Sequence, residues 1–425
     1  MQKKMTQRLI PALMAVAFAG SASAAGFQLL EQNASGIGNS YAGSAAVAEN
    51  ASTIFYNPAG MTELQAREIS GGISAIKTSF EFTNNGSVTP GLTGNGGDAG
   101  GWGVVPNAYL SWQVSKDVYL GLGIGAPFGL KTEYDEPWIG AAQAVSFDIK
   151  TINLNPSIAW RVNDKLSLGF GVSWQKIDAE YIRRGGINGV PGIPNGVLPN
   201  TTVKMEIDDA SWGWNVGVLL KPTAQTKIGL SYRSKVKYET DGNVSVTGPS
   251  SAVNAAGSSG VKADIDVPDT FIFSLAQGIG ERWELLGDIS WTGWGSIPQV
   301  DIIRTSGTVA QVLETKYNDV WRYAVGANYK LNDAVKLKFG VAFDESPTPN
   351  DQNRLVSLPD NDRTWFSTGV QWKQSKTSTL DLGLAYLYVK DTNINNNQLA
   401  QGRGLVKGSY DNSAWIFGAQ YSMGF

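Results

Sequence analysis

Ionisable side chains cluster in residues 343–369, where paired carboxylates could exchange protons in catalysis or bind Ca²⁺. This block contains Asp344, Glu345, Arg354, Asp360, Asp362 and Arg363. Because basic residues stand among the acids, the pattern favours an ion-paired loop over a catalytic or calcium site.

The chain of 425 residues contains no histidine and no cysteine. It therefore lacks the usual general base and the commonest metal ligand, which removes Ser-His catalysis. Disulfides, thiolate metal sites and thiol nucleophiles are also excluded. We predict no catalytic residues, no metal site and no cofactor, and hence no enzyme. No basic block or face indicates binding to nucleic acid.

Two adjacent arginines, Arg183 and Arg184, follow a strand-like stretch. A guanidinium inside a protein forms a strong charge-assisted hydrogen bond with a carboxylate, so either residue is a candidate for binding a carboxylate ligand. The alternative is a surface pair that faces phosphates or the acids of a loop.

The strands that would position these residues come after a predicted signal peptide. Lys3, Lys4 and Arg8 precede the apolar run LIPALMAVAFAG, and Ala22-Ser23-Ala24 forms an A-x-A cleavage site. The apolar run of about 12 residues is shorter than the roughly 20 that a spanning helix needs. We predict a secretory signal peptide over residues 1–24.

The mature chain alternates apolar and small or polar residues with a period of two, which indicates β-strands. Examples are DVYLGLGIGA (117–126), KLSLGFGVSWQ (165–175), WGWNVGVLL (212–220) and WRYAVGANYK (321–330). A soluble antiparallel sandwich would alternate in the same way, so alternation by itself predicts β structure and not a membrane location.

The lengths of the connections distinguish these two folds. Strands are predicted at 69–82, 102–114, 117–128, 144–160, 165–178, 203–220, 226–239, 263–277, 282–292, 309–330, 335–343, 364–372, 379–389 and 413–425. Short turns alternate strictly with long segments between them, as in bacterial outer-membrane barrels. We therefore predict an all-β fold, a 14-stranded antiparallel transmembrane β-barrel.

Aromatic residues gather at the strand ends, as interface girdles do; they are Trp160, Trp174, Trp283, Trp291, Trp321, Trp372 and Trp415. The last strand ends on Phe425. Such an ending is similar to the signal that the outer-membrane barrel assembly machinery reads, so this machinery is a predicted partner.

A barrel of this width needs an internal filling or remains a pore. Residues 25–68 precede the barrel at 69–425 and are too few for an independent domain. We predict that they plug the lumen as an N-terminal hatch. The alternative is a disordered tail, but STIFYNPAGM (52–61) carries aliphatic and aromatic residues that such tails tend to lack.

The segment AGFQLLEQNASGIGNSYAGSAAVAENASTIFYNPAGM resembles the N-terminus of the FadL family, outer-membrane transporters of long-chain fatty acids and other hydrophobic compounds. The resemblance continues through PFGLKTEY, GWNVGVLLKP, YRSKVK and FDESPTPNDQNRLVSLPDNDRTWFSTG. It covers essentially the whole mature chain. It implies a fourteen-stranded barrel with a hatch, capture of ligand near the extracellular loops and a pocket beside the mature N-terminus.

The resemblance also implies functional residues in the hatch. The candidates for ligand binding or gating are Phe27, Leu29, Phe55, Asn57, Pro58 and Ala59. For the first two residues the alternative is plain packing within the plug. For Asn57-Pro58-Ala59 the alternative is a structural turn that supports the plug without gating.

In the family a kink in the third strand opens the wall, so that a ligand leaves sideways into the membrane. The matching residues are Gly125, Pro127, Phe128 and Gly129. A proline cannot donate to a strand ladder, and the neighbouring glycines permit unusual backbone angles. The alternative is that the strand simply ends there. The family's basic carboxylate site aligns with Arg183.

We therefore expect a monomer in the outer membrane of a Gram-negative bacterium, in contact with lipid and lipopolysaccharide. Its expected function is passive uptake of long-chain fatty acids or similar hydrophobic ligands. The alternatives are an uptake channel for aromatic hydrocarbons such as toluene or xylene and a general diffusion porin.

Overall fold

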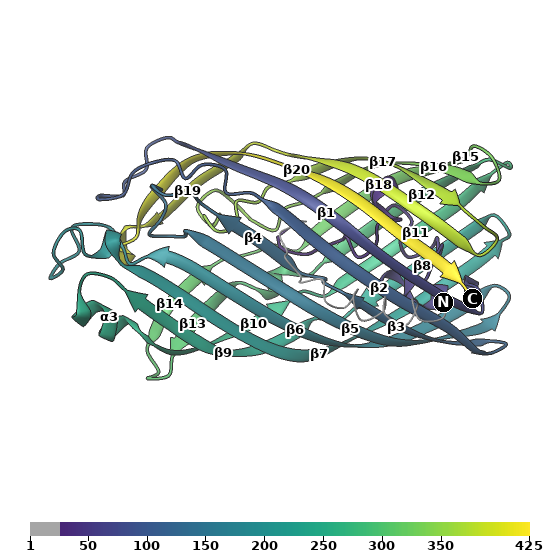
Figure 1. Cartoon of the computed structure of the whole chain (residues 1–425), viewed down its shortest axis with the longest axis horizontal. Coiled ribbons are helices and arrows are strands. Elements are labelled where there is room, and N and C mark those ends of the chain that lie inside the picture. The colour runs from purple at the N-terminus through teal and green to yellow at the C-terminus, as the bar shows by residue number, and fades with distance from the viewer. Residues whose placement is uncertain (1–25) are drawn as a thin grey trace, which may run out of the picture.

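A computed structural model describes residues 26–425, so the predicted signal peptide (1–24) lies outside the described residues. Twenty strand segments form one antiparallel sheet. The sheet closes into a barrel because β1 (Arg67–Asn84) pairs with β20 (Gly404–Gly424) on one side and β2 (Trp102–Ser115) on the other (Figure 1).

The other segments follow one another around the wall. They are β3 (Val118–Gly125), β4 (Gly129–Glu133), β5 (Ser146–Asn163), β6 (Leu166–Arg184), β7 (Thr202–Thr223), β8 (Thr226–Arg233), β9 (Val236–Thr247), β10 (Ser259–Val267), β11 (Thr270–Ile279), β12 (Trp283–Thr292), β13 (Gln299–Arg304), β14 (Val309–Glu314), β15 (Val320–Lys330), β16 (Val335–Asp344), β17 (Arg363–Lys373), β18 (Ser378–Val389) and β19 (Thr392–Gln398). The short helices are η1 (Ile37–Asn39), α2 (Thr53–Tyr56), η2 (Pro58–Glu63), η3 (Leu198–Asn200), α3 (Ser251–Gly257), η4 (Trp294–Ser296) and η5 (Leu399–Gln401).

Six strands of the wall consist of two successive segments, such as β3 with β4 and β8 with β9, so the described residues form a barrel of 14 strands. This confirms the predicted all-β, antiparallel fold. Within residues 26–425 no helix has the length and apolar content needed to cross a membrane. The C-terminus and α3 lie at opposite ends of the barrel (Figure 1).

The apolar face of each alternating strand points outward. In β7, Trp212 is 65% exposed and Trp214 is 44% exposed, and in β15 Val325 is 66% exposed. The intervening Asn215 and Ala324 are buried on the inner side. Outward apolar side chains in every second position match a surface that faces lipid.

Several strands run further than predicted, on the side of the barrel that carries α3. The predicted long segments 129–143, 293–308 and 390–412 contain β4, β13 and β19. These segments carry mostly charged or amide side chains, for example the run NINNNQ in β19, although Ile303 of β13 is exposed. The period-two hydrophobic signal is lost there because that part of the wall does not face the hydrocarbon core.

Residues 26–66, here called the N-terminal segment, lie inside the barrel (Figure 1). Inward-facing glycines make room for it. A Cβ on Gly169 would lie 2.2 Å from the Ala59 nitrogen, and one on Gly340 would lie 2.1 Å from the Asn39 carbonyl carbon. Glycine is therefore required where the segment touches the backbone of the wall.

Two ionic clusters hold the segment to two separate parts of the wall. Glu49 pairs with Lys336 at 2.7 Å and with buried Lys338 at 2.6 Å, both in β16. Glu63 pairs with Lys221 of β7 at 2.6 Å and with Lys227 of β8 at 3.6 Å. The part of the segment between these glutamates is thus held at both ends.

Candidate functional site

The third strand of the barrel is interrupted at the residues predicted to kink. β3 ends at Gly125 and β4 begins at Gly129, and both pair with β5. Pro127 lies between them and has no N–H for a ladder, while the Phe128 N–H donates to Thr151 Oγ1 over 2.9 Å. The strand stops and then resumes, so residues 126–128 are not part of the strand predicted at 117–128.

The interruption leaves the wall without a ladder on one side. β2 pairs with β3 from Ala108 to Ser115, whereas residues 102–107 pair only with β1. β4 pairs only with β5. Among the described residues no ladder pair joins β2 to β4, and a barrel wall is normally held there by backbone hydrogen bonds.

The start of the N-terminal segment fills this break from the inside. The Leu29 N–H donates to the Pro127 carbonyl over 2.8 Å, and the Gly129 N–H donates to the Phe27 carbonyl over 2.9 Å. Residues 27–29 thus act as a short added strand on the free backbone groups of the break. The structure brings the predicted residues Phe27 and Leu29 together with the predicted kink.

Gln32 binds the break through its side chain. Its Nε2 donates to the Ala126 carbonyl over 2.6 Å, and its Oε1 accepts from the Ala126 N–H over 3.0 Å. A Cβ on Gly125 would lie 2.4 Å from Oε1, so glycine permits this approach. The amide side chain replaces the backbone partner that the break removes.

The Asn57-Pro58-Ala59 turn joins two parts of the N-terminal segment to β7. Asn57 is fully buried, and its Nδ2 donates to the carbonyls of Ala45 (2.7 Å) and Val218 (3.0 Å). Its Oδ1 accepts from the Ala59 N–H over 3.1 Å and caps η2, in which Pro58 takes the first position. These contacts are those of structural support.

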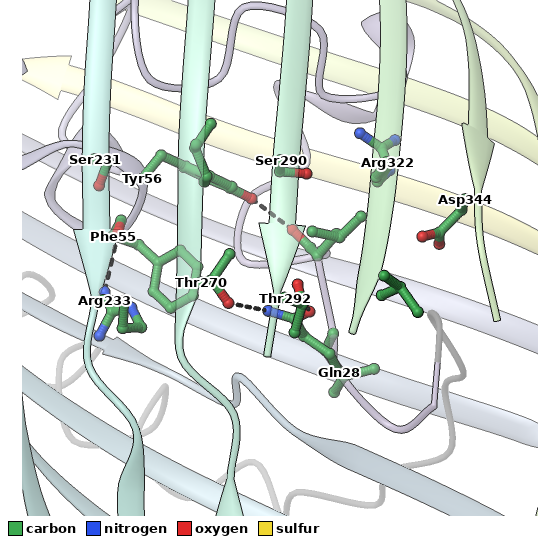
Figure 2. Close-up of a pocket in the computed structure, with 14 residues that line it drawn as sticks. Gln28, Phe55, Tyr56, Ser231, Arg233, Thr270, Ser290, Thr292, Arg322 and Asp344 are labelled. Atoms are coloured by element: carbon green, nitrogen blue, oxygen red, sulfur yellow. Dashed lines mark hydrogen bonds between the residues drawn. The ribbon is translucent and has the colours of Figure 1, made fainter. Parts of the chain in front are cut away.

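A narrow cavity of about 50 Å³ lies between the N-terminal segment and strands β8, β11, β12, β15 and β16 (Figure 2). Its apolar lining comprises Leu29, Leu30, Phe55, Ile272 and Val320. Two arginines, Arg233 and Arg322, and one acid, Asp344, also line it. An apolar wall with guanidinium groups suits a molecule that has an apolar body and an anionic end.

The two arginines are held by neutral groups. Arg233 donates to Ser173 Oγ (2.9 Å) and to the Phe55 carbonyl (3.0 Å), and it stacks over the Phe55 ring at 4.2 Å. Arg322 donates to the Ser40 carbonyl over 2.6 Å. No salt bridge to Arg233 occurs among the described residues, so its charge is available to a ligand.

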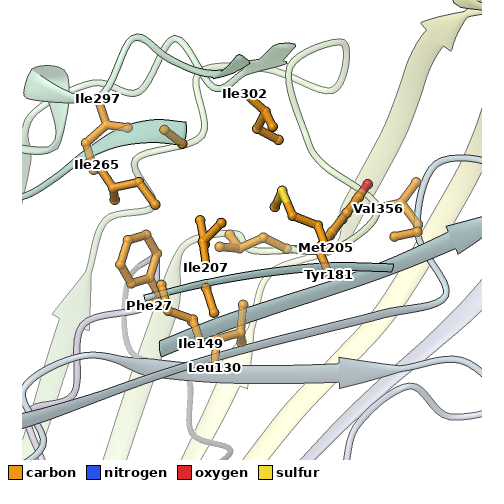
Figure 3. Close-up of a cluster of buried hydrophobic side chains, with 14 of the residues drawn as sticks. Phe27, Leu130, Ile149, Tyr181, Met205, Ile207, Ile265, Ile297, Ile302 and Val356 are labelled. Carbon is orange, nitrogen blue, oxygen red and sulfur yellow. The ribbon is translucent and has the colours of Figure 1, made fainter. Parts of the chain in front are cut away.

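A cluster of buried apolar side chains, here called the vestibule, includes Phe27 (Figure 3). Leu130, Ile149 and Ile207 lie beside Phe27 in this view, and Tyr181 and Met205 lie further away. At that far end a second cavity of about 160 Å³ is lined by Tyr181, Met205, Ile302, Arg183 and Arg304.

The two arginine candidates have different surroundings. Arg183 is buried and lines the second cavity, where it donates to Gln311 Oε1 over 3.0 Å and has no salt bridge among the described residues. Arg184 turns away and pairs with Glu136 through Nε at 2.7 Å. Only Arg183 therefore remains a carboxylate candidate, because the charge of Arg184 is already paired with a loop acid.

The block 343–369 forms ion pairs, as predicted. Arg363 pairs with Asp360, and Lys390 pairs with Asp362 at 3.8 Å. Asp360 also accepts from the Gly26 N–H over 2.9 Å, so this loop holds the start of the N-terminal segment. Within residues 26–425 no group of acidic residues is arranged to hold a metal ion.

Glu31 is a buried acid beside these residues. Burial raises the pKa of its carboxyl to about 7, which the charges of Arg363 and Arg322 reduce only in part. Its Oε2 has no hydrogen-bond partner. The carboxyl is thus close to its protonation midpoint near neutral pH.

Sequence reasoning missed Arg233, Arg322 and Gln32. The two arginines occupy inward positions of alternating strands, and in WRYAVGANYK Arg322 stands opposite the apolar face. A search for basic residues on the inward face would have found them. Gln32 carries no comparable signal, because its role depends on a backbone break some ninety residues away in the chain.

The sequence profile of the outer membrane protein transport proteins (OMPP1/FadL/TodX) matches residues 15–425. Outer membrane protein P1 of Haemophilus influenzae is 32% identical over 421 residues, which cover 91% of this chain and 90% of that protein. The long-chain fatty acid transport protein of Escherichia coli K12 is 27% identical and covers 100% of both chains.

Solved structures show the same fold. A Pseudomonas aeruginosa FadL homologue superimposes with a TM-score of 0.86 at 23% identity and covers 94% of this chain and 99% of its own. The Pseudomonas putida toluene transporter TodX has a TM-score of 0.66 at 16% identity and covers 88% and 94%.

The profile match spans almost the whole chain, and the relatives are matched over nearly their full length. The barrel and its outward apolar residues agree with an outer-membrane location. The chain belongs to the OMPP1/FadL/TodX family of outer-membrane transport proteins, which are channels for hydrophobic compounds and not enzymes.

Proposed function

We propose that this protein carries long-chain fatty acids passively across the outer membrane. The observation that supports this is the lumen cavity, in which the apolar side chains of Leu29, Phe55 and Val320 surround the guanidinium groups of Arg233 and Arg322. A fatty acid has the matching chemistry. Each buried CH₂ contributes roughly 0.8 kcal/mol, and the carboxylate gains a charge-assisted hydrogen bond.

The proposed route begins at the far cavity, where Arg183 meets the carboxylate. The acyl chain then passes along the apolar vestibule to Phe27 and the lumen cavity. It leaves sideways between β2 and β4, where the described wall lacks a ladder. The N-terminal segment acts as the hatch on this route, because residues 27–32 cover the opening and must move before a ligand can pass.

The surroundings of the barrel belong to the same proposal. The outward apolar residues contact lipid, and the charged strand ends beyond them contact lipopolysaccharide. The exposed C-terminal Phe425 is the signal to the barrel assembly machinery. One chain closes the barrel, so the proposed route needs no residue from a second chain.

Aromatic hydrocarbons are the second candidate substrates. The ring of Phe27 packs against Phe128 at 5.8 Å and against Trp294 at 4.8 Å, which makes an aromatic surface on the route. TodX, which has the same fold, is a toluene transporter.

Uptake of labelled oleate and of toluene should be compared in a host that lacks its own transporter. If fatty acids are the substrate, Arg233→Gln and Arg322→Gln lower oleate uptake roughly 10-fold or more, because a hydrogen bond to a charged group contributes about 1.5–3 kcal/mol. Toluene uptake stays unchanged. The exposed Arg282→Gln is the matched control.

Oleate uptake that neither variant alters would contradict the carboxylate site. Large ion conductance of the wild-type protein in planar bilayers would instead indicate a general diffusion porin.

A further inference from the structure

The wall has a second interruption, between β10 and β13. β10 pairs with β9 along all of its residues, but only Val261 and Lys262 pair with β13. The next segments, β11 and β12, pair along all of their residues, beginning with Thr270 opposite Thr292. Between these ladders, residues 263–269 face residues 293–302. The Gly293 N–H donates to the Asp269 carbonyl over 3.0 Å, but no ladder pair joins the two stretches in the described chain.

Trp294 closes this second break from the inside. It lies on the 3-10 turn η4, where the wall leaves the strand path, and it is fully buried. Its ring centroid lies 4.8 Å from that of Phe27 and 5.9 Å from that of Tyr317. A Cβ on Gly26 would lie 2.7 Å from the indole, so the start of the N-terminal segment packs directly on it.

The indole N–H of Trp294 has no hydrogen-bond partner, although it is buried. Buried indole N–H groups usually donate to an acceptor, which fixes the ring. Trp294 is held by ring contacts alone, so its rotation breaks no hydrogen bond to the protein.

On the outer surface, an open notch of about 670 Å³ lies over the same break. Its lining includes Trp291, Gly293, Gly295 and Tyr317. Trp291 pairs in register with Trp321, which is 43% exposed at the upper end of the outward apolar band. The notch therefore lies at the level where aromatic girdles meet the membrane interface.

The charged residues that line the notch indicate which class of ligand can enter it. Asp269 and Asp319 line the notch with a single lysine, Lys235, which pairs with Asp266 at 3.5 Å. This balance does not attract an anion. Behind the mouth the surface is aromatic and aliphatic, with Trp294, Phe27 and Ile297 in one buried cluster.

We propose that Trp294 is the stopper of a second lateral opening, through which small uncharged apolar molecules dissolved in the outer leaflet reach the vestibule beside Phe27. This inference rests on the proposed function, since it adds an access route to the same lumen. Phe27 contacts both Phe128 at the first break and Trp294 at the second, and these two rings also meet edge to face at 6.3 Å, so the two openings adjoin.

The test uses the full mature chain in phospholipid vesicles and the photoactivatable arene 3-trifluoromethyl-3-phenyldiazirine. Illumination followed by peptide mass spectrometry locates the labelled residues. We expect labelling within residues 293–298 that excess toluene suppresses at least several-fold. Exposed Phe273 of the lipid-facing band should be labelled whether or not toluene is present.

Trp294→Ala should raise labelling of Phe27 and Ile297 several-fold, and Trp294→Phe should retain the wild-type pattern. Trp321→Ala is the control for loss of an exposed indole at the same level. Labelling at 293–298 that toluene does not reduce would overturn the proposal, and this wild-type result does not depend on any variant folding. Oleate uptake tests the proposed function separately, because it requires neither the probe nor toluene.

Discussion

Asn57 combines two donor bonds and one acceptor bond in a single buried amide. Each bond joins a different part of the molecule: the Ala45 carbonyl, the β7 backbone at Val218 and the start of η2. Because a backbone carbonyl left unsatisfied in a buried site costs free energy, the identity of this one side chain controls how the N-terminal segment is seated.

Replacing Asn57 with aspartate tests whether this side chain holds the N-terminal segment in place. The acceptor bond to Ala59 remains, but both donor bonds are lost, at roughly 1–3 kcal/mol for each unsatisfied partner. We expect the segment to loosen while the barrel stays folded. Chymotrypsin should then cleave after Tyr41 or Tyr56 in the variant and not in the wild-type protein.

The matched control is Asn332→Asp, because Asn332 is exposed and uses only its acceptor oxygen, for the amides of Ala334 and Val335. Equal protease resistance of Asn57→Asp and wild type would show that the turn does not hold the segment.

Glu31 predicts a dependence of stability on pH. Its pKa is raised by burial from 4.5 to about 7, so the folded protein holds this proton more tightly than the unfolded chain does. Stability is therefore greatest below the unfolded pKa and falls as pH rises from about 4.5 to about 7. At roughly 1.4 kcal/mol per pKa unit, the loss is on the order of 3 kcal/mol.

Glu31→Gln should remove this loss, since the amide stays neutral throughout. Urea unfolding followed by tryptophan fluorescence at pH 5 and pH 8 measures the difference between the two proteins. A variant that is as sensitive to pH as the wild type would show that other groups cause the effect.

At the scale of elements, the interrupted third strand is the feature with the clearest consequence. β4 continues the path of β3 after three residues, and residues 27–32 supply the missing backbone partners. The sequence indicated the break because Pro127 has no N–H. It could not indicate that residues 27–29 bind to the break, because hydrogen bonds between residues 27–29 and 127–129 leave no trace in local composition.

Pro127→Val restores a backbone donor and should favour a continuous strand. A new ladder hydrogen bond contributes about 0.5–1.5 kcal/mol, which lowers the open population, and with it oleate uptake, by roughly 2- to 10-fold. Heat-modifiable migration in gel electrophoresis should show a folded barrel. Pro222→Val, near the exposed end of β7, is the control, and unchanged uptake by Pro127→Val would contradict the side exit.

At the scale of the whole molecule, the N-terminal segment fills a barrel that would otherwise be wide enough to conduct water. The N-terminal segment is clamped by Glu49 to β16 and by Glu63 to β7 and β8. Lys338 also pairs with Asp381 of β18 at 3.1 Å, so the first clamp ties two strands and the segment together.

Glu49→Gln breaks the first clamp and leaves two lysines without their shared acid. Removing one partner of a buried ion pair costs about 3–5 kcal/mol. We expect the segment to shift and single-channel conductance in planar bilayers to rise well above that of the wild type. Asp333→Asn, which removes an exposed ion pair with Lys330, should leave conductance unchanged.

A conductance of Glu49→Gln equal to that of the wild type would mean that packing against the wall glycines suffices to hold the segment.

The class of fold follows from the residue pattern alone. Strict alternation and the parity of the connections require an antiparallel barrel, because each lipid-facing strand must be apolar in every second residue. The number of strands follows from the same pattern, although the pattern does not predict the polar segments β13 and β19 or the polar upper part of β9. The family's motifs supplied the expectation of transport.

Contacts between distant residues come from the tertiary structure. Arg233, Arg322 and Phe55 come from three distant parts of the chain, yet they line one cavity. It also separated Arg183 from its neighbour Arg184, because adjacent side chains on a strand point to opposite faces. Which inward side chains share a cavity depends on barrel closure and on the fit of the segment inside, and these are properties of long-range packing that no local pattern encodes.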